Sequence, residues 1–541
     1  MATQKTNGST SGALELDALV IGAGFSGLYT LYKLRDEMGM NVRVYDAADG
    51  VGGTWYWNRY PGARCDSESY YYSYSFSEEL EQEWEWTSKY PEQPEILRYL
   101  NHVADRFDLR RDIQLDTRIA EAVYDEAHNR WQVRTEAGEE ISAKFLISAV
   151  GCLSSTNLPD FEGLDQFRGE WYHTGRWPHE PVDFTGKRVG LVGTGSTGIQ
   201  ATPVIAAQAD HLTVFQRTPN YSLPARNALL PPEEQAEVKA NYRELRREVR
   251  ESRGGFPYAP TEKSAMDYTP EEQQALCEEL WELGGFRFLF GSFNDIMTSE
   301  EANEVVAEFV RGKIREVVKD PATAKLLTPT DHPYGSKRPP IDTGYYEAYN
   351  RDNVSLVDVR SAPIVAITPN GLRTADGAEY ELDIIVFATG FDAMTGSLQK
   401  IDIRGKGGQA LAEKWAGGPR TYLGLQSAGF PNLFTITGPG SPSVLTNMPV
   451  AIEQNVDWIS DCIEYMRTHG MESIEAKPDA EEGWVDHVNE VASYTLYDQA
   501  NSWYVGANIP GKKRVFMPYV GGMIEYRRHC DESASKGYDG F

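Results

Sequence analysis

Cysteine is scarce in this sequence, and its positions fit neither a disulfide framework nor a metal site. The 541 residues contain five cysteines, with no C-x-x-C pair and no cysteine–histidine spacing of a zinc site. They are Cys65, Cys152, Cys277, Cys462 and Cys530. This pattern is typical of a protein of the reducing cytoplasm. It excludes a redox-active cysteine pair and a bound zinc ion.

Long apolar runs are also missing. No stretch reaches the ~18 consecutive apolar residues of a membrane-spanning helix, so we expect no membrane span. Residues 1–13 lack the basic end and the apolar stretch of a secretion signal, and we interpret them as a flexible tail.

Positive charge is in deficit. The 52 Lys and Arg residues against 80 Asp and Glu give a net charge of −28. Such a field repels phosphate backbones and anionic lipids, which argues against a nucleic-acid partner. Hydrophobic residues make up 41% and charged residues 24%, as in ordinary globular proteins. The length allows about three domains.

Two distant segments carry the pattern of a β-strand, a glycine-rich turn and a helix. The first turn has Gly22, Gly24 and Gly27; the second has Gly193, Thr194, Gly195, Ser196 and Gly198. In such turns the glycines let a pyrophosphate approach bare backbone at the positive end of a helix. The sequence therefore predicts two dinucleotide-binding folds.

The residue at the end of the following strand differs between the two segments. Asp46 lies nineteen residues after Gly27, and Arg217 lies nineteen residues after Gly198. A carboxylate there accepts hydrogen bonds from ribose hydroxyls, whereas an arginine binds a 2′-phosphate. The first site is thus predicted to bind FAD or NAD and the second NADPH. The ordinary alternative for Arg217 is a solvated surface charge.

Two dinucleotides in one chain indicate hydride transfer from NADPH to a flavin, which can pass electrons on to O₂. Disulfide reductases share this arrangement but need a cysteine pair, which is lacking here. The sequence therefore predicts a flavoprotein reductase or monooxygenase.

The predicted fold class is α/β, with two Rossmann-like domains and a helical insertion. Helical periodicity fills the region from Pro231 to about Asp320, where Thr269 and Glu272 form a capping box and Thr298 is expected to cap a third helix. We predict an FAD-binding domain from residues 14–153 and 387–541, an NADPH-binding domain from 154–223 and 331–386, and a helical subdomain from 224–330.

Two further stretches carry a family resemblance. Residues 167–178, FRGEWYHTGRWP, match the fingerprint F-x-G-x-x-x-H-x-x-x-W-[P/D], and residues 53–66, GTWYWNRYPGARCD, match a second family motif. On these motifs the chain resembles the type I Baeyer–Villiger monooxygenases over nearly its whole length. The resemblance implies an enzyme that uses FAD, NADPH and O₂ to convert a ketone into an ester or lactone, through a peroxide at the flavin C4a atom. We infer no obligate protein partner from the sequence.

The resemblance also assigns roles to individual residues. It implies catalytic roles for Arg338 and Asp66, which would form a pair beside the flavin, and cofactor contacts from both of these as well. The other cofactor contacts it implies are Thr54, Trp55, Thr218, Lys337 and Trp503, beside the turn residues, Asp46 and Arg217. The substrate pocket would include Ser443, Val444, Leu445 and Met448, and the fingerprint residues Phe167, Gly169, His173 and Trp177 would couple NADPH binding to domain movement.

Ordinary structural roles compete with these assignments. Arg338 could be a surface loop residue, Asp66 a turn cap and Trp503 a core residue. Two other functions also remain open. A flavin monooxygenase could oxidise nitrogen or sulfur instead of ketones, although the Trp177-Pro178 ending argues against it. A non-catalytic redox sensor could bind both dinucleotides without consuming NADPH and O₂.

Overall fold

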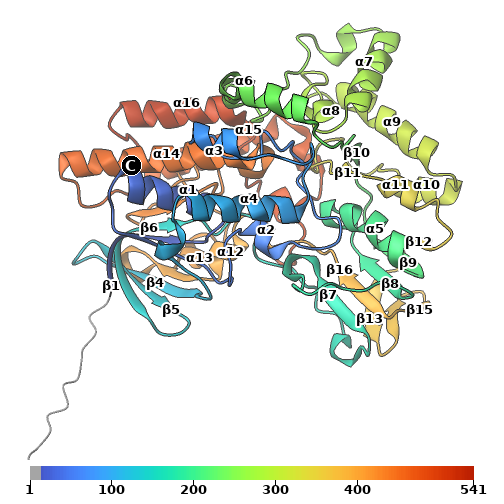
Figure 1. Ribbon diagram of the computed structural model, residues 1–541, viewed down its shortest axis with the longest axis horizontal. Coiled ribbons are helices and arrows are strands. Elements are labelled where there is room, and N and C mark those ends of the chain that lie inside the picture. The colour runs from blue at the N-terminus through green and yellow to red at the C-terminus, as the bar shows by residue number, and fades with distance from the viewer. Residues whose placement is uncertain (1–13) are drawn as a thin grey trace, which may run out of the picture.

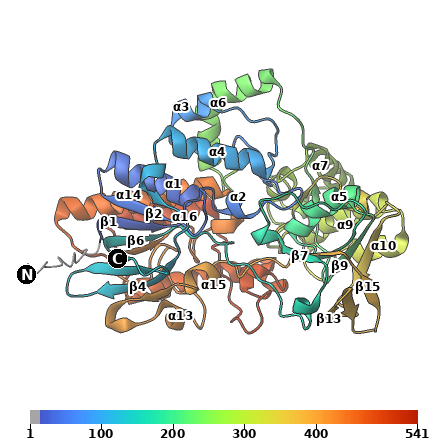
Figure 2. The ribbon, with the colours of Figure 1, turned by 60° about the horizontal axis from the view of Figure 1, so that its bottom comes forward.

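The computed structural model describes residues 14–541, so the predicted tail at 1–13 lies outside the described residues. The described chain is an α/β structure built around two main sheets. These sheets lie in separate lobes, and a group of helices stands above the second lobe in Figure 1 (Figures 1 and 2). This agrees with the predicted fold class.

The first sheet is mixed and contains strands from both ends of the chain. Its order is β17-β4-β5-β6-β1-β2-β3, with β18 also paired to β6. The strands are β1 (Leu14–Ile21), β2 (Val42–Tyr45), β3 (Ile113–Gln114), β4 (Ile119–Asp125), β5 (Arg130–Thr135), β6 (Glu140–Ser148), β17 (Asp402–Arg404) and β18 (Leu433–Thr435). Because β17 and β18 complete it, the expected return of the C-terminal half to the first nucleotide fold is confirmed.

Strand β1 lies inside the sheet between β6 and β2, and its second half is buried on both faces. The apolar run of residues 18–21 predicts this for a parallel strand. Val20 packs in the same cluster as helices α1 (Phe25–Tyr32) and α14 (Met448–His469). Its neighbour Leu19 packs on the opposite face with Trp131 of β5. The sheet therefore holds the turn after β1 rigidly between two hydrophobic layers.

The second sheet is fully parallel, with the order β12-β9-β8-β16-β7. Its strands are β7 (Glu170–His173), β8 (Arg188–Val192), β9 (His211–Gln216), β12 (Val354–Asp358) and β16 (Ile384–Phe387). Helix α5 (Ser196–Gln208) packs against β8 and β9. The small sheet of β13 (Ile364–Thr368), β14 (Gly371–Thr374) and β15 (Glu379–Glu381) shares a hydrophobic cluster with β8, β9 and β16.

The predicted helical segment is present after the second nucleotide fold. It contains α6 (Pro232–Arg250), α7 (Pro270–Leu283), α8 (Arg287–Phe290), α9 (Glu300–Val317) and α10 (Pro321–Leu327). The capping box of Thr269 and Glu272 is confirmed. The expected cap at Thr298 is wrong, because the backbone N–H of Thr298 closes a turn onto Asp295 and the Ser299 hydroxyl caps α9 instead.

The remaining α-helices and strands lie between or after these elements along the chain. They are α2 (Thr54–Trp57), α3 (Glu78–Glu83), α4 (Gln93–Arg106), β10 (Leu223–Pro224), β11 (Ile341–Asp342), α11 (Tyr345–Ala348), α12 (Gly396–Gln399), α13 (Leu411–Lys414), α15 (Pro478–Ser493) and α16 (Gly522–Ser535). Within residues 14–541 no helix is long and apolar enough to cross a membrane. The domain boundaries given above stay a prediction.

Candidate functional site

The first glycine-rich turn joins β1 to α1 at the core of the first sheet. Gly22 has a φ of +110°, and a Cβ atom there would lie 2.4 Å from the carbonyl oxygen of Ala149. A Cβ on Gly27 would lie 1.8 Å from the carbonyl oxygen of Gly22. Gly24 instead faces Gly53, whose Cα atom would lie 3.2 Å from an added Cβ. Gly22 and Gly27 are therefore required for packing, and Gly24 allows the backbone of Gly53 to approach the turn closely.

The helix after this turn is left uncapped in a way that suits a pyrophosphate. In the described chain no side chain caps the N-terminus of α1, and its first turn holds no acidic residue. Free backbone N–H groups at a helix N-terminus form an anion site. The turn therefore fits the dinucleotide that the sequence predicts.

Asp46 follows β2 and reaches back to this turn. Its carboxylate accepts hydrogen bonds from the backbone N–H groups of Ala23, at 2.6 Å, and Ala48, at 2.8 Å. Burial raises the pKa of Asp46, and these two donors oppose the rise. The side chain is thus fixed at the turn, although its contact with a ribose stays a prediction.

Thr54 and Trp55 begin α2, directly after Gly53 at the first turn. Thr54 is exposed, whereas Trp55 is buried and its indole N–H donates to the Tyr72 hydroxyl at 3.1 Å. Tyr72 belongs to the aromatic run of residues 70–76, whose members Tyr70, Tyr71 and Tyr74 are buried. The aromatic run therefore packs beside the first glycine-rich turn.

The second glycine-rich turn repeats this design at the end of β8. Gly193 has a φ of +113°, and a Cβ atom on Gly198 would lie 2.1 Å from the Gly193 carbonyl oxygen. A Cβ on Gly195 would meet no described atom within 4 Å. Ser196 starts α5, and in the described chain no side chain caps this helix either. Gly195 thus faces space that a pyrophosphate could fill.

Positive charges gather beside this turn. Arg217 and Thr218 follow β9, and the Thr194 hydroxyl donates to the Thr218 carbonyl oxygen at 2.9 Å. Burial lowers the pKa of the half-buried Lys337, Asp331 opposes this, and the charges of Arg217 and Arg360 lower it further. Cations that crowd together in this way fit a site for an anion such as the 2′-phosphate.

Arg360 is a member of this cluster that the sequence did not single out. Its guanidinium donates to the Arg217 carbonyl oxygen at 3.2 Å and to the Thr218 hydroxyl at 3.3 Å, and it pairs with Asp331. Arg360 follows β12, which pairs with β9 in parallel. The sequence signal that could have identified Arg360 is its position after a strand that pairs with the strand before Arg217.

Arg338 lies where the loop after α10 meets the predicted substrate loop. Its guanidinium Nη1 donates to the carbonyl oxygen of Val444 at 3.4 Å. Its carbonyl oxygen accepts from the Asn220 side-chain amide at 3.1 Å. The structure therefore places Arg338 against the loop that is predicted to bind the substrate, and not on an isolated surface loop.

Asp66 is close enough to Arg338 for their charges to interact, but no ion pair joins them among the described residues. Burial raises the pKa of Asp66 to about 6, and the Arg338 charge is the largest influence that opposes this rise. The hydrogen-bond partner of its carboxylate is the side chain of Gln200, at 3.0 Å. The direct pair that the resemblance implies remains a prediction.

The predicted substrate loop begins just before α14. Ser443 has a φ of +43°, and Val444 is buried. Leu445, Met448 and Trp503 are partly buried and pack on the same hydrophobic cluster as Val444. The structure thus places Trp503, from the C-terminal segment, in the same hydrophobic cluster as the predicted substrate loop.

The fingerprint residues lie on and around β7, at the edge of the second sheet. A Cβ on Gly169 would lie 2.3 Å from the Asp383 carbonyl oxygen and would also press on the Phe167 ring. His173 ends β7, and its Nδ1 accepts from the Gly175 N–H at 3.0 Å. Trp177 is buried and packs against Tyr172. Their role in domain movement stays a prediction.

The helical segment contributes one face of the Arg338 environment, which the sequence did not reveal. The Arg338 guanidinium lies 4.8 Å from the ring centre of Phe286. The next residue, Arg287, pairs with the buried Glu68, which also accepts from the Tyr258 hydroxyl at 2.8 Å. Glu68 follows Asp66 by two positions, so this pair ties the helical segment to the Asp66 turn.

Some buried polar atoms near these residues lack a protein partner. Among the described residues, Oδ1 of Asn220, Oδ1 of Asn447 and Oγ of Ser502 accept or donate no hydrogen bond. Buried polar atoms are almost always paired, so atoms of this kind fit contact with a ligand or water. They add to the fit between this region and bound cofactors.

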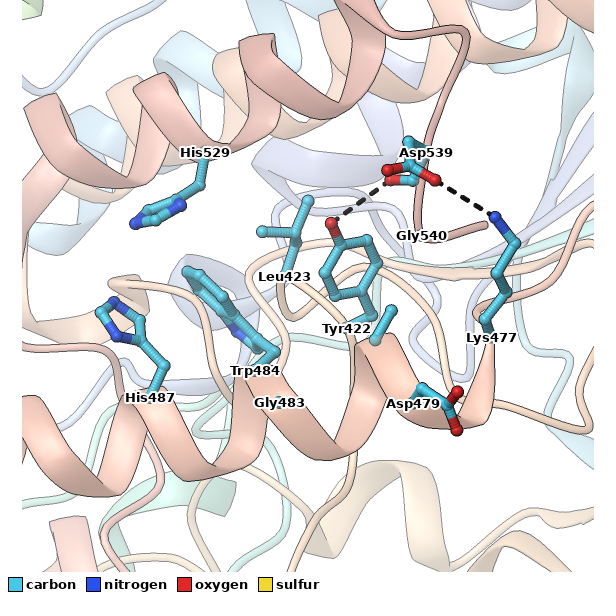
Figure 3. A pocket seen from close by; sticks show the side chains of 11 residues that line it. Tyr422, Leu423, Lys477, Asp479, Gly483, Trp484, His487, His529, Asp539 and Gly540 are labelled. Carbon is cyan, nitrogen blue, oxygen red and sulfur yellow. Dashed lines mark hydrogen bonds and ion pairs between the residues drawn. The ribbon is translucent and has the colours of Figure 1, made fainter.

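A separate cavity of about 440 Å³ lies between α15, α16 and the C-terminal segment (Figure 3). Trp484 and His487 reach into it from α15, and His529 faces them from α16. The Trp484 indole N–H donates to the carbonyl oxygen of Gly440 at 3.0 Å. None of the predicted site residues lines this cavity.

Comparison with known proteins places the chain among flavin enzymes. The family model of flavin-binding monooxygenase-like proteins matches residues 17–226. A Baeyer–Villiger monooxygenase from Pseudooceanicola batsensis is 48% identical over 99% of this chain and 98% of its own length. A phenazine N-monooxygenase from Lysobacter antibioticus is 45% identical over 97% of this chain and 96% of its own length.

Solved structures agree with this placement. An oxidised steroid monooxygenase bound to NADP has a TM-score of 0.93 and 56% identity, over 97% of this chain and 99% of its own. OTEMO in complex with FAD and NADP has a TM-score of 0.94 and 43% identity, over 98% of this chain and 99% of its own. The glycine turns, the Arg338 environment and these similarities agree: the chain belongs to the Baeyer–Villiger monooxygenase family.

Proposed function

We propose that this chain is an FAD- and NADPH-dependent monooxygenase that inserts one atom of O₂ beside a ketone carbonyl, giving an ester or lactone. The observation that carries the proposal is the position of Arg338, which contacts the substrate loop at Val444 and lies within charge range of Asp66. Membership of the Baeyer–Villiger monooxygenase family supports the same reaction.

The residues of the first turn would hold FAD and those of the second turn NADPH. A flavin held there would supply the redox chemistry, which is acceptance of a hydride from NADPH and activation of O₂. Arg217, Thr218 and Lys337 would bind the 2′-phosphate, with Arg360 as a further contact. The 2′-phosphate then distinguishes NADPH from NADH.

Arg338 would act on the substrate. A guanidinium keeps its proton at any working pH, and it can stabilise the negative oxygen that forms when a carbonyl is attacked. Its packing on Phe286 and its bond to Val444 fix its direction. Asp66 balances its charge without a direct bond, which leaves the guanidinium N–H groups available to the substrate.

The test is product analysis with a panel of linear, aryl, cyclic and steroid ketones in air. We expect an ester or lactone, heavier than the ketone by one oxygen, in proportion to the NADPH consumed. Peroxide is measured in parallel. If NADPH is consumed and only peroxide appears, ketones are not the substrates and the proposal fails in its substrate half.

A second candidate is oxidation of an aromatic ring nitrogen. The similarity to a phenazine N-monooxygenase supports it, because 45% identity is close to that of the Baeyer–Villiger relative. Phenazine and related heterocycles therefore belong in the panel. An N-oxide without any ester would favour this second candidate.

We also propose that the enzyme works in the cytoplasm without an obligate protein partner. All five cysteines are free and buried, which suits a reducing compartment. Both glycine turns, Arg338 and the substrate loop belong to one chain. Activity of the purified chain alone, at a rate that does not depend on added cell extract, is the expected result.

A further inference from the structure

Gln200 joins the second glycine turn to the turn that carries Asp66. It lies on α5, one helical turn after Ser196, and is 5% exposed. Its side-chain amide donates to the carboxylate of Asp66 at 3.0 Å and to the carbonyl oxygen of Arg64 at 3.2 Å. Its oxygen accepts from the Tyr60 hydroxyl at 2.7 Å and from the Arg64 N–H at 3.4 Å.

These partners fix the orientation of the amide. A backbone N–H can only donate and a backbone carbonyl can only accept, so the two bonds to Arg64 define which end of Gln200 is nitrogen. The same orientation points an N–H at Asp66. The contact is therefore a directed hydrogen bond and does not depend on the choice between two equivalent rotamers.

The backbone around Gln200 is as closely packed as its side chain. Gly62 has a φ of +80°, and a Cβ there would lie 2.4 Å from the Gln200 carbonyl oxygen. The turn before Asp66 thus rests directly on α5. A shift of α5 would change the hydrogen bonds of Gln200 and the position of this turn together.

The groups around Asp66 come from several elements. The charges of Arg338 and Arg64, the bond from Gln200 and the backbone of Ile341 all favour the carboxylate and oppose the effect of burial on its pKa. The Tyr60 hydroxyl and the Cys65 thiol are also within range of its charge. Gln200 is the one neutral side chain with a hydrogen bond to this carboxylate in the described chain.

We propose that Gln200 is a positioning residue that couples the NADPH-binding helix α5 to the carboxylate of Asp66 and, through that carboxylate, to Arg338. When α5 is in place, Gln200 keeps Asp66 ionised opposite Arg338. When Gln200 cannot donate, Asp66 holds its proton to higher pH and the charge of Arg338 is no longer balanced. This inference rests on the proposed function for the roles of Asp66 and Arg338.

The test uses the full-length enzyme with FAD and the variants Gln200→Met and Gln200→Glu. Both remove the N–H donor, and Gln200→Glu keeps the shape of the side chain and adds a negative charge. We expect the acid limb of the pH profile for ester formed per NADPH to move up by about one pH unit in Gln200→Met and at least as far in Gln200→Glu. The kcat should fall more than the KM for NADPH rises.

The matched control is Gln208→Met, at the exposed end of the same helix, which should change neither quantity. The decisive comparison repeats Gln200→Met in an Asp66→Asn background. If Gln200 acts through Asp66, the shift disappears there. A shift of equal size in that background, or no shift in the wild-type background, overturns the proposal.

A second readout separates this proposal from the proposed function. Thermal unfolding measured as a function of pH needs no turnover. The pH at which Tm changes should move up in Gln200→Met, and it should not move when the same substitution is made in the Asp66→Asn background. If the wild-type enzyme forms no ester, the proposed reaction fails while the unfolding data still test the contact between Gln200 and Asp66. If the difference in Tm between the wild-type enzyme and Gln200→Met does not vary with pH, the contact between Gln200 and Asp66 is contradicted.

Discussion

Lys337→Met should turn the enzyme from NADPH towards NADH. Methionine keeps most of the side-chain volume but removes the charge from a half-buried position beside Arg217 and Arg360. A hydrogen bond to a charged group contributes about 1.5–3 kcal/mol, which corresponds to about a 10-fold to 150-fold loss in kcat/KM for NADPH. The value for NADH should change little, because NADH has no 2′-phosphate.

The structure also predicts that Lys337→Met loses more activity with NADPH than Arg217→Ala does. Arg217 is exposed, and an exposed charge contributes about 0.2–1 kcal/mol, so Arg217→Ala should cost less than about 5-fold. Both variants are measured by the rate of NADPH or NADH oxidation, with Lys319→Met as an exposed control. Equal losses for both nucleotides in Lys337→Met would refute the 2′-phosphate site.

Three further predictions follow from the same contacts. Arg338→Ala should abolish ester formation but leave flavin reduction by NADPH largely intact. Product analysis measures the ester and stopped-flow absorbance measures flavin reduction. A normal ester yield would refute the role of Arg338. Gly195→Ala should raise the KM for NADPH without lowering Tm. Gly198→Ala should lower Tm, because its Cβ would lie 2.1 Å from a carbonyl oxygen. Equal falls in Tm for the two variants would contradict this prediction. Asp66→Asn should stabilise the fold above pH 6 by at most about 3 kcal/mol, because burial raises the pKa of Asp66 to about 6. This gain should fade as the pH drops from 6 towards 4, where the wild-type carboxyl becomes protonated, and unfolding at pH 8 and pH 4 checks it; destabilisation at pH 8 would contradict the sign.

Local sequence patterns predicted the parts of the fold that local chemistry determines. Both predicted strand–turn–helix segments are present, as β1 followed by α1 and as β8 followed by α5. The capping box at Thr269 formed as expected. The cap of α9 moved from Thr298 to Ser299, because neighbouring hydroxyls carry the same signal and only tertiary contacts choose between them.

Local sequence patterns also fail to reveal those residues of the candidate site that are brought in by tertiary packing. Glycine turns and charged residues at strand ends can be counted along the chain, so Asp46 and Arg217 were found. Gln200, Phe286 and Arg360 belong to no motif, and each acts through residues far away in the sequence. Such contacts arise when helices and strands pack together, which residue spacing does not describe.

The most direct test of the central claim is the origin of the oxygen atom in the product. The enzyme is incubated with NADPH, a ketone that it converts, and dioxygen labelled with a heavy oxygen isotope in unlabelled water. We predict one labelled atom in each ester or lactone molecule, with no label when NADPH is omitted. An ester that carries no label would contradict the proposed reaction. A labelled product that still contains the ketone carbonyl would contradict it as well.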